Sequence, residues 1–144
     1  MPESPPIEFF NEDIEFEVKD EQKTKEWLQK IISNYSFELE SLNYIFCSDE
    51  YLHQMNVDYL DHDTLTDVIT FDNSDIEGVI EGDVFISIDR VVDNAHSFNI
   101  TPERELQRVM VHGLLHLLGF DDKSPELKKL MKSKEDECLS LLSL

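Results

Sequence analysis

The chain has 144 residues, with 12 Lys or Arg against 32 Asp or Glu, so its formal net charge is −20 at pH 7. This length is typical of one domain, residues 1–144, and the 40% of hydrophobic residues argues against a disordered chain. The charge argues against a general nucleic-acid binder, because phosphate contacts need cationic groups. The longest apolar run, residues 109–120, is too short for a membrane span, which needs about 20 residues.

The cysteines and the N-terminus bear on the compartment. Cys47 and Cys138 are the only cysteines, and their spacing is typical of neither a disulfide framework nor a zinc knuckle. The opening MPESPPIEFF lacks the basic region and following apolar stretch of a signal peptide. We therefore expect a cytoplasmic protein.

The first third of the chain predicts strands and helices in turn. Apolar residues alternate over residues 7–18 (IEFFNEDIEFEV), which predicts one strand or a pair of strands. Asp20 is expected to cap a helix that has apolar residues at helical spacing. A further strand is predicted at residues 42–48 (LNYIFCS), and Ser48 or Asp49 is expected to cap a short helix after it.

The middle of the chain predicts two more strands and a helix. Residues 65–72 (LTDVITFD) are rich in β-branched and aromatic side chains, which favours a strand. Residues 82–88 (GDVFISI) predict a second strand, and residues 89–98 (DRVVDNAHSF) predict a helix.

Capping signals mark two helices in the last third. Thr101 and Pro102 are typical of an N-cap and the first residue of a helix, which is expected to end near Gly119. Ser124 and Pro125 repeat the signal for a final helix. Because strands and about five helices mix without strict βαβ alternation, we predict an α+β fold with one small sheet.

The segment HGLLHLLGFDD, residues 112–122, carries the chemistry. His112 and His116 are the only polar side chains in residues 109–120, and a helix that is apolar all round is buried. Residues at i and i+4 share one helix face, so the two imidazoles are able to bind one tetrahedral cation. The alternative is that both histidines are structural core residues.

Residues after the predicted helix complete a metal site. Gly119 favours the left-handed conformation that reverses the chain, which brings Asp122 back toward the histidines. Three protein ligands and one open position are typical of a catalytic zinc site. Alternatively, Asp121 accepts a hydrogen bond from a ligand histidine and so holds its tautomer.

The spacing H-x-x-x-H-x-x-G-x-x-D also matches the frame of metzincin proteases. These enzymes place a glutamate general base directly after the first histidine. Here that position is Gly113, so peptide hydrolysis lacks its proton acceptor.

Three segments resemble a known family. HGLLHLLGFDD is similar to the signature H-G-x-L-H-L-x-G-[YF]-D-H of the YbeY family, bacterial metal-dependent endoribonucleases of ribosomal RNA maturation. LTDVITF at residues 65–71 resembles the family strand T-D-V-L-S-F, and GDVFIS at residues 82–87 resembles G-D-[IV]-x-I-S. The resemblance covers roughly residues 42–142.

The resemblance implies an α+β fold with a small mixed sheet and one Zn²⁺ per chain. It implies single-stranded RNA as substrate, 16S ribosomal RNA maturation and ribosome quality control as the setting, and the small ribosomal subunit as partner. His112 and His116 then match the first two ligands, and Asp122 matches the third, where the family usually has histidine.

Two departures from the family pattern affect the site. Asp122 adds a negative charge to the metal, which acidifies bound water less and favours harder metals. Leu60 stands where the family usually has arginine in an N-x-x-Y-R segment, so a phosphate-binding cation is missing. His62 nearby is a candidate substitute, and an exposed loop histidine is the alternative.

The mechanistic hypothesis is metal-assisted phosphodiester cleavage by bound water or by the RNA 2′-OH. The candidates for proton transfer are Asp121, His62 and Asp67. The candidates for phosphate contacts are Arg104, Arg108, Lys123, Lys128 and Lys129. Residues 104–134 carry a net charge of +3 and the rest −23, although a solvated helix face also accounts for these cations.

Two other functions remain open at this point. One is a non-catalytic ribosome-assembly factor, whose metal only staples the C-terminal helices. The other is a metal-dependent hydrolase or protease of non-RNA substrates. The acidic surface predicts basic ribosomal proteins as partners, and neither DNA nor a membrane is expected.

Overall fold

A four-stranded mixed sheet organises the chain in the computed structural model, which describes residues 6–60 and 66–143. The elements in chain order are β1 (Ile7–Asn11), α1 (Glu21–Asn34), β2 (Glu38–Cys47), α2 (Asp49–Leu60), β3 (Val68–Asp72), β4 (Val79–Ser87), α3 (Ile88–Phe98), α4 (Pro102–Leu117), α5 (Pro125–Ser140) and a short 3₁₀ helix (Leu141–Ser143). This single α+β domain confirms the predicted fold class.

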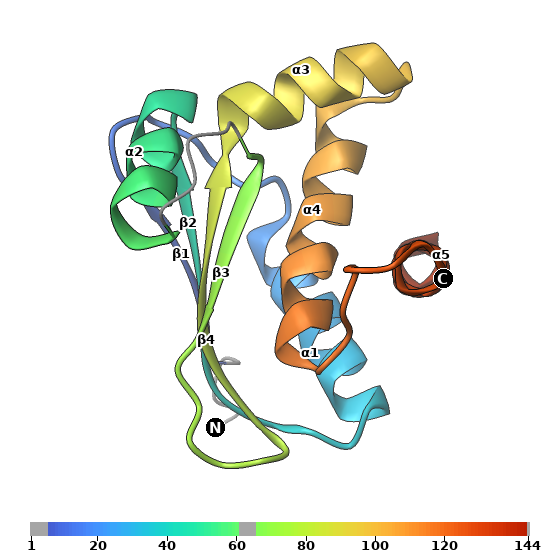
Figure 1. The fold of residues 1–144 in the computed structure, drawn as a ribbon. Coiled ribbons are helices and arrows are strands. Elements are labelled where there is room, and N and C mark those ends of the chain that lie inside the picture. The colour runs from blue at the N-terminus through green and yellow to red at the C-terminus, as the bar shows by residue number, and fades with distance from the viewer. Residues whose placement is uncertain (1–5, 61–65, 144) are drawn as a thin grey trace.

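The strand order is β1-β2-β4-β3, with β1, β2 and β4 parallel and β3 antiparallel to β4. β3 is therefore an edge strand. Figure 1 shows α1 and α4 against one face of the sheet, α2 against the other, and α5 outside α4. None of the helices within the described ranges is long and apolar enough to cross a bilayer.

The two faces of the sheet bury cores of very different size. The main core joins apolar residues of β1, β2 and β4 to those of α1, α4 and α5. A smaller cluster of Cys47, Leu52 and Ile69 lies under α2. α4 is thus covered on one side by the sheet and on another by α5, while α1 packs on the same face of the sheet.

Two glycines allow α4 to lie unusually close to the sheet. A Cβ atom on Gly113 would lie 2.7 Å from Cγ1 of Val84, on β4. A Cβ atom on Gly82 would lie 2.9 Å from both terminal methyls of Leu117. Each glycine therefore removes the side chain that would hold the helix and the sheet apart.

Two buried hydrogen bonds fix the position of α4 along the sheet and that of α5 relative to α1. The Tyr44 hydroxyl on β2 donates to the Met110 carbonyl of α4 at 2.9 Å. The Trp27 indole on α1 donates to the Cys138 carbonyl of α5 at 2.8 Å. Both donors are buried, so loss of either partner leaves a polar group unsatisfied in the core.

The predicted helix starts are mostly confirmed. The side chains of Thr101 and Ser124 accept hydrogen bonds from the third backbone amide of α4 and of α5. Ser48, rather than Asp49, caps α2 by accepting from the amide of Tyr51. Asp20 is the N-cap residue of α1, as expected, but its φ is 50° and its side chain makes no capping hydrogen bond; its carbonyl accepts from Thr24.

The strand boundaries differ from the predicted ones. Residues 12–18 form no second strand, because Ile14, Phe16 and Val18 pack on the core from an extended segment without a ladder. β2 and β4 begin at Glu38 and Val79, before the predicted starts, since these two ends pair with each other.

We expect Gly113→Ala to destabilise the protein. The overpacking cost of about 1–3 kcal/mol exceeds the roughly 1 kcal/mol that a helix gains when alanine replaces glycine. Chemical denaturation measures the change. Val84→Ala removes the clashing methyl, so the double variant should lose less than the sum of the two single variants. Strict additivity would contradict the close packing.

Candidate metal centre

The last turns of α4 and the reversal after them bring three ligands together. His112 and His116 are one turn apart on α4, and both are partly buried. Gly119 has a φ of 104°, and the amides of Gly119 and Phe120 donate to the carbonyls of His116 and Leu115 at 3.0 Å. This left-handed end of the helix returns the chain over its own last turn, as the sequence predicts.

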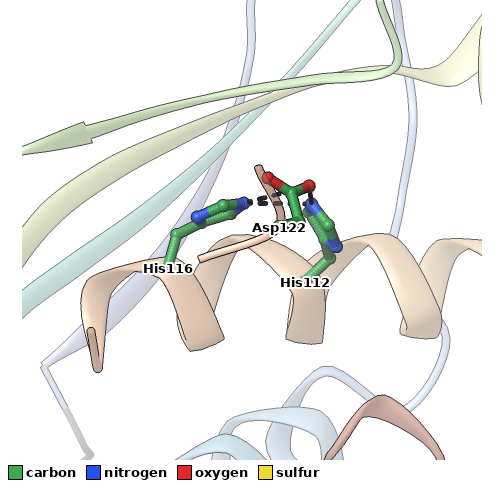
Figure 2. A group of neighbouring side chains, drawn as sticks. All are labelled: His112, His116 and Asp122. Atoms are coloured by element: carbon green, nitrogen blue, oxygen red, sulfur yellow. Dashed lines mark hydrogen bonds and ion pairs between the residues drawn. The ribbon is translucent and has the colours of Figure 1, made fainter. Parts of the chain in front are cut away.

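Asp122 then faces both imidazoles (Figure 2). The two Nε2 atoms are 3.1 Å apart, and Oδ2 of Asp122 is 3.5 Å from that of His112 and 3.7 Å from that of His116. Tetrahedral zinc with bonds of about 2.0–2.1 Å needs ligand atoms about 3.3 Å apart. The three atoms therefore approximate one face of a tetrahedron, and they form the one candidate metal group found in residues 6–60 and 66–143.

A carboxylate on α5 sets the tautomer of His112. Nδ1 of His112 lies 2.7 Å from Oε2 of Glu135, whose side chain is buried. Burial alone raises the pKa of Glu135, but the hydrogen bond with His112 and the charge of Arg108 outweigh it and lower that pKa. The ionised carboxylate only accepts, so Nδ1 carries the proton and Nε2 keeps its lone pair for a metal.

Arg108 holds that carboxylate in place. Its guanidinium donates to both oxygens of Glu105, at 2.8 and 2.7 Å, and to Glu135 at 3.2 Å. Glu105 is fully buried, and its hydrogen bonds with Arg108 raise the pKa of the guanidinium further. Asp67 on the chain just before β3 adds a contact at 3.6 Å. The guanidinium is therefore engaged by three carboxylates, and we leave Arg108 out of the proposed phosphate contacts.

Burial and the neighbouring His112 lower the pKa of His116 below its usual 6.5. A lowered pKa favours the neutral ring, which is the form that binds metal. Protons therefore compete for this ligand only at pH values below the usual range for histidine.

The ligands open onto a groove beside the edge strand. A cavity of about 470 Å³ lies between them and β3, and its polar lining includes Thr66, Asp67, Thr70 and Asp72. All three ligands line this cavity. The fourth position of a metal bound here would thus face a space large enough for a substrate group.

The other predicted site residues are spread around this centre. Asp67 lines the groove, whereas Asp121 accepts a hydrogen bond from the Lys123 amide. The carboxylate at Nδ1 of His112 is that of Glu135, so Asp121 does not hold the tautomer of this histidine. His62 lies outside the described residues. Four of the predicted phosphate contacts are exposed: Arg104, Lys123, Lys128 and Lys129.

Glu105 and Glu135 were missed from the sequence. Glu105 had a weak signal, since it lies three residues before Arg108 on one helix face. Glu135 lies on another helix, 23 residues after His112, and no local spacing links the two.

The comparison with protein families decides the assignment. The sequence model for endoribonuclease YbeY matches residues 7–143. The chain belongs to the endoribonuclease YbeY family. The resemblance found in three short segments thus extends over almost the whole chain.

Curated members of the YbeY family align along their length. The endoribonuclease YbeY of Cytophaga hutchinsonii is 53% identical over 94% of this chain and 94% of its own. That of Flavobacterium johnsoniae is 48% identical over 92% of this chain and 94% of its own. A solution structure of a Thermotoga maritima protein matches with a TM-score of 0.61 at 29% identity, covering 93% of this chain and 89% of that one.

We expect the purified protein, prepared without chelator, to carry close to one metal ion per chain, and His116→Ala to lose it. Removing one of three protein ligands leaves too few donors for tight binding. Elemental analysis measures the content, and circular dichroism checks the fold. His96→Ala, an exposed histidine of α3, is the control. A metal-free, folded wild type would contradict the centre.

Glu135→Gln should weaken metal binding about 10- to 100-fold, because the amide no longer imposes the Nδ1–H tautomer. Competition with a chromogenic chelator gives the dissociation constant. Glu137→Gln, on the exposed side of α5, should leave it unchanged. Equal affinity of both variants would show that Glu135 does not orient the ligand.

Proposed function

We propose that this chain is a metal-dependent endoribonuclease specific for single-stranded RNA, acting in the cytoplasm in 16S ribosomal RNA maturation and ribosome quality control. Family membership supports the endoribonuclease activity. The observation that carries the metal dependence is the triad of His112, His116 and Asp122 at tetrahedral spacing, open toward a groove. Zinc is the metal that this nitrogen-rich donor set favours.

In this mechanism the residues of the chain hold the metal, orient its histidine ligands and accept a proton. A zinc ion bound here would supply Lewis acidity, which would stabilise charge on a scissile phosphate and acidify water. His112, His116 and Asp122 would hold it, with Glu135 fixing the ring of His112. Asp67 lines the groove together with Asp72, and we assign the proton transfer to Asp67, one of the candidates from the sequence. The guanidinium of Arg108 lies 3.6 Å from this carboxylate and helps to hold it at the groove.

A purely structural metal fits this arrangement less well. All three ligands come from residues 112–122, so a metal would link α4 only to the loop that follows it. The contact between α4 and α5 is already made by buried apolar residues of α5, including Met131, Cys138 and Leu139. The fold therefore does not need a metal to staple its C-terminal helices.

A protease of the metzincin type is disfavoured by packing. Gly113 occupies the position of the glutamate base, and its missing side chain faces Val84 and Thr70 of the sheet. The Cβ atom of a glutamate there would lie 2.7 Å from Cγ1 of Val84, so this side chain does not fit while α4 keeps its present distance from the sheet. The chain therefore lacks both this base and the space for it.

We expect the metal-loaded protein to cleave single-stranded RNA, and Asp122→Ala to lower the rate about 100-fold or more, because several kcal/mol of charge stabilisation depend on the metal. A gel assay with end-labelled RNA measures the rate, and Asp136→Ala, exposed on α5, is the control. Undiminished cleavage by folded Asp122→Ala would exclude this centre as the active site.

A further inference from the structure

A second cavity lies on the other side of the metal ligands. It also measures about 470 Å³, and it lies between α4, α5 and the end of α3. His112 and Asp122 line both this cavity and the groove along β3. A polymer that crosses the metal centre from the β3 groove therefore enters the second cavity next.

Two lysines of this cavity have no ion-pair partner within the part of the chain that the structure describes. Lys128 and Lys132 lie four residues apart on α5, so they share one face of the helix, and both are exposed. By contrast, Lys19, Lys25 and Lys134 each lie within 4.0 Å of a carboxylate. In a chain of net charge −20, two unpaired cations at one cavity favour an anionic ligand there.

The acidic groups deeper in the cavity do not oppose such a ligand strongly. Glu105 and Glu135 line it, but both are bonded to Arg108. Glu135 also accepts from His112. The two carboxylates are thus occupied by partners inside the protein, whereas Lys128 and Lys132 are exposed to solvent.

Apolar side chains complete the cavity. Phe98, the last residue of α3, is 59% exposed, and Ile100 beside it is 39% exposed. Two cations alone would bind any polyanion. An exposed aromatic ring in the same cavity additionally favours an unstacked base, as found in a single strand. Stacking of single-stranded bases on aromatic side chains, with lysines along the backbone, is the general basis of single-strand binding. A duplex keeps its bases stacked inside and offers none to Phe98.

We propose that this cavity binds the nucleotide adjacent to the scissile phosphate of a single-stranded RNA, with its base on Phe98 and its backbone phosphates on Lys128 and Lys132. The inference rests on the proposed nuclease function and adds the course of the RNA strand across the protein. The strand runs from the edge of β3, over the metal ligands, to the face of α5. The occupied cavity selects single strands over duplexes.

Binding to the metal-loaded protein tests the inference without cleavage. The probe is a labelled twelve-nucleotide single strand with 2′-O-methyl groups, checked to be intact after the measurement, and fluorescence anisotropy gives its dissociation constant across a salt series. Lys128→Ser with Lys132→Ser should weaken binding and reduce the slope of log affinity against log salt by about 1.4, since each phosphate contact contributes about 0.7. Phe98→Ala should weaken binding about 5- to 100-fold at an unchanged slope.

Matched controls come from residues that line neither cavity. Lys23→Ser with Lys30→Ser removes two exposed lysines of α1 that have no ion-pair partner among the residues the structure describes, and Phe10→Ala removes an exposed ring of β1. Both should bind like the wild type. If the α5 and Phe98 variants also bind like the wild type, the cavity is not a nucleotide site. Equal affinity for a duplex of the same sequence would overturn the single-strand preference.

The two proposals fail separately. If the wild type cleaves RNA while the cavity variants bind and cleave normally, the cavity proposal is wrong and the nuclease proposal stands. If the wild type binds the strand through this cavity but cleaves no RNA, the nuclease proposal is wrong and the binding site stands.

Discussion

The close approach of α4 to the sheet is the constraint on which the site depends. Gly113 meets Val84, and Leu117 meets Gly82, so that at each point only one of the two facing residues places a side chain between the helix and the strand. This contact sets the imidazoles of α4 beside the edge strand β3 and so creates the groove between them. The same contact removes the position from which a protease would extend its glutamate base. The close packing of α4 on the sheet therefore positions the metal ligands and also excludes a glutamate base at residue 113.

A buried charge network carries that constraint to the neighbouring helix. Arg108 connects Glu105 of its own helix to Glu135 of α5, and Glu135 reaches His112. Buried charges are costly unless they are paired and hydrogen-bonded, so these groups are stable only together. In an acidic chain, one arginine thus contacts three carboxylates, those of Glu105, Glu135 and Asp67, and through Glu135 it supports one metal ligand. The packing of α5 on α4 becomes part of the geometry of the centre.

Local patterns predicted the parts of the structure that local interactions build. The caps at Thr101 and Ser124, the turn at Gly119 and the ligand set of residues 112–122 all follow from neighbours in sequence. The early starts of β2 and β4 did not, because each strand is extended by pairing with the other. The role of Glu135 could not be predicted for the same reason, since its carboxylate reaches His112 only when α5 packs beside α4.

Ligation and orientation come from different parts of the chain. The three ligands lie in one contiguous segment, whereas the residue that fixes the ring of His112 lies on α5. Substitutions in α5 are therefore able to change how firmly a metal is held while the donor atoms stay the same. Over evolutionary time, such a division lets affinity drift with metal availability without passing through a form that has lost a ligand.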